Sequence, residues 1–424
     1  MHAANLTIAE KIKSVRLSMD IKQEALAQAI GIVRSKISDA ESGKREYTRE
    51  QVDILRKLLR IEGAPLYDSE IAYYEKQLDL WREYIKEART YEAAKMHEKL
   101  SVITKLPYER DLTFHYRMFE AKLFMETEEF SAAEEVLENA KPLLDETTAK
   151  NRYHYHYNMG MFNFYKVNYM EAKNFYKTAF NMNIEGFGRE PSLYYNLALC
   201  YSRLGMAVLS VSTILDVYNR FRYDKTSELG LFLDNTLAVN RIRLNQIEQA
   251  KETLCRALER ATIQDNRVYI GCALHNYGYA YMREGNFEVA LEYFRQQEAY
   301  FTEGDDIHLE NLYQKIRCLM ALKKKALCKP LILLGADYAK DSRRYSILFQ
   351  SLSHLLNMND EALQFIEDKT IPCLIENHEL SRALEFCEEL ILTYTKKDLK
   401  IKTLESIAIK SNILYRITFG DDTY

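Results

Sequence analysis

The sequence is poor in the residues that interrupt helices. Its 424 residues include only 14 glycines and 6 prolines, too few to supply the turns of a fold made of many short strands. Long stretches with helical periodicity lie between them. This scarcity favours an all-α fold, and the length allows two or three domains or one extended array of repeats.

Paired cysteines and long apolar runs are also missing. The seven cysteines stand singly, with no CxxC pair, which argues against a disulfide framework or a zinc site and favours reduced, buried thiols. No run of 18 apolar residues occurs, so no transmembrane helix is predicted. The first residues, MHAANLTIAEKIK, lack the apolar core of a signal peptide. We expect a cytoplasmic protein with no membrane partner.

Sequence signatures of catalysis are absent too. Gly186–Phe187–Gly188 is too short to be a phosphate-binding glycine loop. His154 and His156 are two positions apart, which places them on different sides of a helix rather than on one metal ion. We therefore predict no enzymatic activity, no cofactor and no metal site.

Charge is distributed unevenly along the chain. Residues 1–61 contain 12 Lys and Arg against 8 Asp and Glu, a net charge of +4, whereas the remainder contains 46 against 54, a net charge of −8. A basic small domain on an acidic body suits a protein that meets phosphates at one end, although four charges alone do not decide this.

Residues 22–43 have the pattern of two short helices joined by a tight turn. The periodicity predicts helices over 23–30 and 34–42, with Gly31 supplying the turn and Gly43 ending the second helix. The stretch resembles the lambda-repressor/Cro-type helix-turn-helix, and the matching residues are Gln23, Leu26, Ala27, Gly31, Ser35, Ile37, Ser38, Glu41 and Gly43. A plain helical hairpin would share the apolar spacing but would not explain these polar residues.

Flanking signals complete a small domain around this motif. Thr7 and Glu10 have the spacing of a capping box for a helix over 7–18, and Thr48 is a candidate N-cap for a further helix. We predict a five-helix lambda-repressor-like domain over 1–61. The Gly- and Pro-containing joint Glu62–Pro65 places a linker at 62–70.

From residue 71 to 424 the chain is helical and repetitive. Small residues recur about 38 to 40 positions apart, at Ala133, Ala172, Ser210, Ala250 and Ala290. A second small residue lies twelve positions before most of them, at Gly160, Ala198, Ala238 and Gly278. This is the tetratricopeptide pattern with units longer than the usual 34 residues. We predict a right-handed superhelix of about eight or nine repeats, with the last helix, 399–417, as a cap.

Such an array curls into a groove that suits an extended peptide. Amide side chains satisfy both backbone donors and acceptors, and asparagines lie two positions before three of the small residues, with a fourth nearby. The candidate peptide-binding residues are Asn158, Asn196, Asn235 and Asn276, with Tyr157, Tyr195, His275 and Tyr279 beside them. The alternative is that these asparagines only bond the neighbouring helix.

A Cro-type reader joined to long tetratricopeptide repeats resembles the Rap/NprR/PlcR/PrgX family of peptide-pheromone receptors, and length and repeat number are most similar to its NprR members. The resemblance implies a cytoplasmic quorum-sensing transcription regulator that binds a short re-imported signalling peptide. It also implies a homodimer or homotetramer whose state sets binding to a double-stranded DNA operator. We expect Gln23, Ser42 and Lys44 to contact phosphates. Base edges would be read by Arg34, Ser35, Lys36, Ser38 and Asp39.

Two other functions remain open. Residues 80–85, LWREYI, resemble the Trp-Tyr stretch of Rap proteins, which implies binding to a sporulation phosphorelay response regulator, alone or beside DNA binding. The alternative is that Trp81 only packs the first repeat. A third possibility is a DNA-tethered scaffold whose groove holds a protein tail rather than a secreted peptide.

Overall fold

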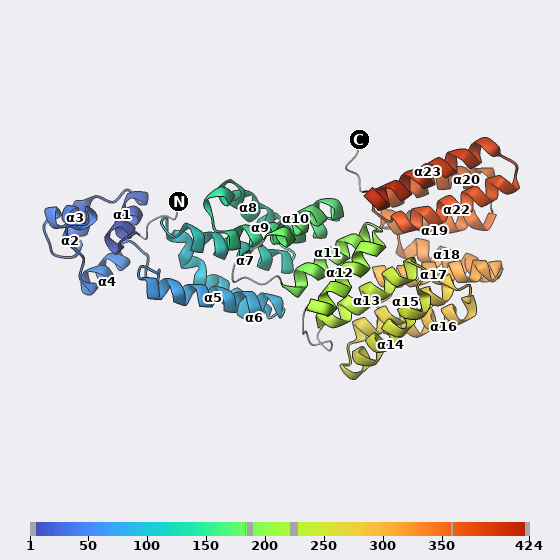
Figure 1. Cartoon of the computed structure of the whole chain (residues 1–424), viewed down its shortest axis with the longest axis horizontal. Coiled ribbons are helices and arrows are strands. Elements are labelled where there is room, and N and C mark those ends of the chain that lie inside the picture. The colour runs from blue at the N-terminus through green and yellow to red at the C-terminus, as the bar shows by residue number, and fades with distance from the viewer. Residues whose placement is uncertain (1–5, 183, 185–189, 221–227, 358, 420–424) are drawn as a thin grey trace. The chain divides into compact units, whose positions relative to one another are not determined.

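The computed structural model describes residues 6–182, 184, 190–220, 228–357 and 359–419, which form helices joined by short connections (Figure 1). No strand occurs in these ranges, so the predicted all-α fold is confirmed. Contacts divide the chain into two compact units: unit 1 contains residues 1–162 and 181–188, and unit 2 contains residues 163–180 and 189–424. Within the described ranges, no helix has the length and apolarity needed to cross a membrane.

Unit 1 begins with a bundle of four helices: α1 (Ile8–Ser18), α2 (Gln23–Ala29), α3 (Arg34–Glu41) and α4 (Arg49–Leu58). The capping box of Thr7 and Glu10 forms as predicted, and Thr48 caps α4. Five helices were expected over 1–61, but the described part of that range holds four. The chain leaves α4 through a residue with positive φ, Arg60 (φ 52°), and the next helix begins only beyond Pro65.

The connection after α4 is packed rather than extended. Ala64 and Leu66 are each 1 % exposed and belong to the same apolar core as the helices of the bundle. Leu106, some 40 positions later, joins that core. Lys11 of α1 donates to the Leu66 carbonyl over 3.1 Å and pairs with the Glu109 carboxylate over 2.7 Å. Residues 62–70, predicted as a linker, therefore attach the bundle to the helices that follow.

The rest of unit 1 consists of longer helices in the same chain order. They are α5 (Asp68–Lys86), α6 (Thr90–Leu100), the 3-10 turn η1 (Ser101–Lys105), α7 (Arg110–Glu126), α8 (Phe130–Ala140), the 3-10 turn η2 (Lys141–Glu146) and most of α9 (Ala149–Tyr165). Trp81 of α5 is fully buried and packs on Tyr116 of α7, with ring centroids 5.2 Å apart. Aromatic packing of this kind joins α5 to α7.

Unit 2 consists of further helices joined by turns, up to the end of the described chain. Its helices are α10 (Tyr169–Asn181), α11 (Pro191–Arg203), α12 (Ala207–Arg220), α13 (Glu228–Arg243), α14 (Ile247–Ile263), α15 (Arg267–Arg283), α16 (Phe287–Gln297), η3 (Glu298–Tyr300), α17 (Asp306–Ala321), α18 (Lys325–Tyr338), α19 (Arg343–Asn357), α20 (Asp360–Phe365), the π-turn η4 (Ile366–Thr370), α21 (Ile371–Glu376), α22 (Leu380–Lys396) and α23 (Lys400–Phe419). α23, predicted as a separate cap, packs against α22 as the second helix of a pair.

The small residues that suggested the repeat lie where helices approach closely. Ala172, Ser210, Ala250 and Ala290 are all fully buried. A Cβ atom added to Gly278 of α15 would lie 2.6 Å from the ring of Phe294 in α16. Within unit 2 the first helices of successive pairs contact one another, α11 with α13, α13 with α15, α15 with α17 and α17 with α19. We call α11, α13, α15, α17 and α19 the first-helix layer.

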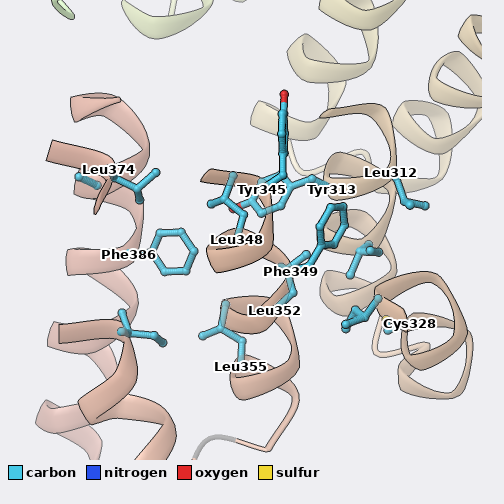
Figure 2. Close-up of a cluster of buried hydrophobic side chains, with 14 of the residues drawn as sticks. Leu312, Tyr313, Cys328, Tyr345, Leu348, Phe349, Leu352, Leu355, Leu374 and Phe386 are labelled. Carbon is cyan, nitrogen blue, oxygen red and sulfur yellow. The ribbon is translucent and has the colours of Figure 1, made fainter. Parts of the chain in front are cut away.

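The C-terminal part of unit 2 has its own apolar core. Figure 2 shows Phe349 and Leu352 of α19 between Tyr313 of α17 and Phe386 of α22. Gly335 of α18 leaves the space that the Phe349 ring fills, because a Cβ atom there would overlap it. This buried apolar packing fixes the positions of α17, α19 and α22 relative to one another. These helices carry the charged side chains described below.

Candidate functional site

The second helix of the predicted helix-turn-helix, α3, is exposed along its polar side. Gly31, with φ +68°, makes the turn between α2 and α3, and Ile37 and Ala40 anchor α3 in the core with no exposure. The side chains of Arg34, Ser35, Lys36 and Ser38 are exposed and Asp39 is half-buried. Ser42 and Lys44, just after the helix, are exposed as well.

Gln23 has a different environment from the other predicted DNA contacts. It is half-buried, and its amide nitrogen donates to the Glu41 carboxylate over 2.8 Å. Its amide oxygen accepts from Arg34 Nε over 3.4 Å, and Arg34 also pairs with Glu24 over 3.2 Å. One residue that the sequence did not suggest lies on the same side: Val33, the N-cap of α3, is 61 % exposed.

The four predicted asparagines do not form one row in the structure. Asn158 lies in unit 1, is 3 % exposed, and donates to the Met118 carbonyl over 2.6 Å. The other three lie on the first-helix layer of unit 2. Asn276 donates to Asn235 over 3.3 Å, and Asn235 donates to the Leu231 carbonyl over 3.0 Å. Asn196 is half-buried.

The aromatic residues predicted to contact the peptide are likewise divided between unit 1 and unit 2. Tyr157 of unit 1 is 8 % exposed, with Lys122 above its ring. On the first-helix layer, Tyr195, His275 and Tyr279 are half-buried. Burial raises the pKa of Tyr195 to about 12. Burial also lowers the pKa of His275, whose Nδ1 lies 3.2 Å from Gln297 Oε1. His275 is thus a half-buried ring that lies within hydrogen-bond distance of Gln297.

Comparison with known proteins relates this arrangement to a group of bacterial regulators. A tetratricopeptide repeat model matches residues 273–298, which are α15 and α16. The chain is 22 % identical over 339 residues to the transcriptional activator NprA of Geobacillus stearothermophilus, covering 76 % of this chain and 82 % of that protein. It is 23 % identical over 363 residues to the response regulator aspartate phosphatase A of Bacillus subtilis, covering 76 % and 94 %.

Solved structures of the same group share the fold. A Rap protein complexed with competence and sporulation factor superposes with a TM-score of 0.70 at 16 % identity, covering 82 % of this chain and 99 % of the other. NprR in complex with its cognate peptide NprX superposes with a TM-score of 0.65 at 19 % identity, covering 80 % and 99 %. The chain therefore shares its fold with these Rap and NprR structures.

In unit 2, α17, α19 and α22 also carry a charged network that the sequence did not reveal. Arg382 of α22 pairs with Glu310 of α17 over 2.7 Å and with Glu379 over 2.8 Å. Arg344 of α19 bonds Glu379 and lies 3.9 Å from Glu310. Burial alone would raise the pKa of Glu310, but Arg382, with His275 and Arg344, lowers it to about 2. The four groups hold α17, α19 and α22 together.

Two further arginines of the layer are less well paired. Arg243 ends α13, and its Nη1 donates to the carbonyl and hydroxyl of Ser202 over 2.7 and 3.1 Å and to Asn240 over 3.3 Å. Arg317 of α17 lies 3.9 Å from both Glu385 and Glu389 of α22. Sequence reasoning missed Arg243, because nothing in the sequence distinguishes a buried arginine from an exposed one. Its one sequence signal is its place two helical turns after Asn235.

Residues 80–85, predicted to bind a response regulator, lie partly in the apolar core of unit 1. Trp81 is fully buried and stacks on His97, with ring centroids 5.7 Å apart. Leu80 beside it is 40 % exposed, and on α6 Tyr91 is 76 % exposed. Trp81 is therefore a packing residue, as the alternative interpretation held, and any contact on this surface belongs to its exposed neighbours.

Two cavities in unit 2 lie away from the predicted peptide contacts. One, of about 250 Å³, is lined by residues of α10, α21, α22 and α23 and of the turn after α11, among them Met170, His378 and Arg416. The other, of about 540 Å³, lies along the exposed side of α12, with Val208, Val211 and Leu215 in its wall. Their linings are apolar on one side and carry no asparagine of the first-helix layer.

Proposed function

We propose that this chain is a peptide-responsive transcription regulator. Its α3 reads a DNA operator in the major groove, its repeats bind a short signalling peptide, and the peptide changes the oligomeric state and thereby DNA binding. The observation that carries the proposal is the exposed polar side of α3 in a bundle with an apolar core and a buried Arg16–Glu41 ion pair, attached by packed contacts to tetratricopeptide repeats.

The DNA face supports specific roles for individual residues. Arg34 and Lys36 project from the first turn of α3, the part of a recognition helix that contacts base edges. Ser35, Ser38 and Asp39 follow on the same helix, and Ser42 and Lys44 suit phosphates at its end. Gln23, held by Glu41, acts as a brace for Arg34 rather than as an independent contact. The exposed Val33 suits the methyl group of a thymine.

The peptide face is proposed on the first-helix layer of unit 2. The solved NprR structure contains its cognate peptide and the solved Rap structure contains competence and sporulation factor, so this fold is suited to short peptides. On this chain Asn235 and Asn276 form an amide pair on α13 and α15, with Asn196, Tyr195, His275 and Tyr279 on the same layer. Asn158 and Tyr157 are assigned structural roles, because both lie in unit 1 and the Asn158 amide is bonded to the Met118 carbonyl.

The proposal is tested by selecting ligands with the full-length protein. A randomised 30-bp duplex pool yields the preferred DNA site, and analytical ultracentrifugation with a pool of synthetic heptapeptides reports the change in oligomeric state. Arg34→Ala is expected to lose about 1–3 kcal/mol of discrimination at one base pair, whereas Arg256→Ala on α14 leaves the DNA site unchanged. A pool that yields no enriched duplex would reject DNA reading.

A second function, binding to a phosphorylated response regulator, is favoured by the 23 % identity to response regulator aspartate phosphatase A. The exposed Leu80 and Tyr91 are the residues that would carry it. The full chain with Arg34→Ala and Lys36→Ala separates the two functions, because it loses DNA binding and keeps unit 1 intact. Unchanged lifetime of a phosphorylated sporulation response regulator in its presence would remove this candidate.

A further inference from the structure

Arg243 is a half-buried guanidinium that lacks a carboxylate partner within the described residues. Its hydrogen bonds all come from Nη1, and all three acceptors are neutral: the Ser202 carbonyl, the Ser202 hydroxyl and the Asn240 amide oxygen. Arg344 of α19 and Arg382 of α22, in contrast, each contact two glutamates. Arg243 therefore differs from its neighbours in having hydrogen bonds without a counter-charge.

Charged groups of both signs surround Arg243. Burial lowers its pKa and Tyr279 raises it, while Arg203 and Arg382 act with burial and Glu385 acts against it. Because an arginine side chain stays protonated in proteins, the group remains a partly buried cation. Burying a charge without a partner is unfavourable, so the folded chain holds a site that an anion would stabilise.

Arg317 brings a second guanidinium to the same acidic neighbour. Its Nη1 is buried without a hydrogen-bond partner in the described chain, and its contacts to Glu385 and Glu389, both 3.9 Å, are longer than hydrogen bonds. Glu385 acts on the charge of both Arg243 and Arg317. Arg243 of α13 and Arg317 of α17 thus share Glu385 of α22 as an acidic neighbour, and Glu385 and Glu389 pair only loosely with Arg317.

A peptide carboxylate fits this site in chemistry and in position. A guanidinium binds a carboxylate through two parallel hydrogen bonds. Arg243 lies eight residues after Asn235 on α13, about 12 Å along the helix at 1.5 Å per residue. An extended peptide covers that distance in about four residues at roughly 3.3 Å each. A heptapeptide whose backbone meets the Asn235–Asn276 pair therefore reaches Arg243.

We infer that Arg243 and Arg317 bind a carboxylate of the peptide, either its C-terminus or an Asp or Glu side chain. The inference rests on the proposed peptide-binding function and names the ligand class: a peptide with an acidic group about four residues from the part held by the asparagines. Arg243 supplies the unpaired charge, and Arg317 exchanges its long contacts to Glu385 and Glu389 for the ligand.

The test uses a synthetic heptapeptide library prepared with free-acid and with amidated C-termini, incubated with the full-length protein and read by affinity-selection mass spectrometry. Retained peptides are expected to need either the free C-terminus or an internal Asp or Glu, and the two preparations distinguish these sources. Arg243→Gln should weaken binding of the retained peptides about tenfold or more, Arg243→Lys should weaken it less, and Arg256→Gln on the exposed side of α14 should leave it unchanged.

A second readout separates ligand binding from a structural role. Because Arg243 carries an unpaired buried charge, Arg243→Gln should leave the melting temperature of the ligand-free protein unchanged or raise it. A lowered melting temperature, or peptides retained without any acidic requirement, would overturn the inference while leaving peptide binding intact. If the wild-type protein retains no heptapeptide at all, the proposed function fails together with it.

Discussion

Arg16 of α1 and Glu41 of α3 form a bidentate ion pair inside the N-terminal four-helix bundle. Arg16 Nε lies 2.6 Å from Glu41 Oε1 and Nη2 lies 2.9 Å from Oε2, with the two side chains 9 % and 3 % exposed. Arg16 Nη1 also donates to the Ile21 carbonyl over 2.8 Å, and Gln23 donates to Glu41. One buried carboxylate thus fixes α3 relative to both α1 and α2.

Replacing that carboxylate should unfold the bundle more easily. Glu41→Ala leaves the Arg16 guanidinium buried without an anion, and breaking such a pair destabilises a protein by about 3–5 kcal/mol. We expect a lower-temperature first transition in differential scanning calorimetry and a parallel loss of DNA binding. Glu46→Ala, in the exposed loop after α3, is the matched control and should change neither. The double variant Arg16→Leu, Glu41→Leu should regain most of the stability, and a single variant as stable as wild type would show that the pair contributes nothing.

The bundle should also depend on its attachment to the next helices. Lys11 is 6 % exposed on its side chain and meets both Glu109 and the Leu66 carbonyl. Glu109→Gln removes the counter-charge, and we expect a loss of about 1–3 kcal/mol together with faster hydrogen exchange at the Leu66 amide. Arg110→Gln, whose ion pair with Glu146 is exposed, is the control. Unchanged exchange at Leu66 would mean that the Lys11–Glu109 pair does not hold this segment and that its other contacts, such as the bond from the Leu66 amide to Glu70, suffice.

The helix-turn-helix region could be predicted from sequence because its signals are local. Thr7 with Glu10 and Gly31 each determine the conformation of a few adjacent residues. The packed connection could not be predicted in the same way. Leu106 and Glu109 meet the bundle from more than 40 positions away, and a Gly- and Pro-containing joint reads as a linker whether or not distant residues cover it.

The repeat pattern predicts a tight contact that one substitution can probe. A Cβ atom at position 278 would lie 2.6 Å from the Phe294 ring, so Gly278→Ala overpacks the α15–α16 crossing. Overpacking of a core typically destabilises by about 1–3 kcal/mol, outweighing the gain in helix propensity from alanine. Urea unfolding should show this loss. The double variant Gly278→Ala, Phe294→Leu frees the space and should recover part of it, and equal stability of both variants would contradict the steric explanation.

For the proposed peptide-binding residues, the sequence spacing predicts which helices carry them but not the hydrogen bonds that each side chain makes. Asn158 and Asn276 both lie two positions before a glycine of the repeat, yet Asn276 bonds Asn235 on the first-helix layer whereas Asn158 bonds the Met118 carbonyl. The ion pairs of Arg382 with Glu310 and Glu379 join α22 to α17 across 72 positions in the first case. Ion pairs between residues so far apart in the sequence depend on how successive repeats stack, which the sequence of a single repeat does not determine.

Two stacked histidines in unit 1 should make its stability depend on pH. His115 of α7 and His154 of α9 are each 6 % exposed, and their ring centroids lie 5.2 Å apart. Burial lowers the pKa of His115 to about 3 and the pKa of His154 well below its usual value. In the unfolded chain both titrate near 6.5. The folded state therefore binds fewer protons than the unfolded state below about pH 6.5, and the stabilisation present above that pH is lost as the pH falls toward 3.

His115→Phe removes one of these titrations while keeping an aromatic ring in the stack. Each histidine contributes a slope of up to about 1.4 kcal/mol per pH unit, so the variant should lose about half of the part of the decline in unfolding free energy between pH 6.5 and 5 that this pair contributes, measured by urea unfolding. Phe119→Leu disturbs the same cluster, where the Phe119 ring lies 4.7 Å from His115, and removes no titrating group. It should lower stability equally at every pH, and an unchanged slope in His115→Phe would place the pH dependence elsewhere in unit 1.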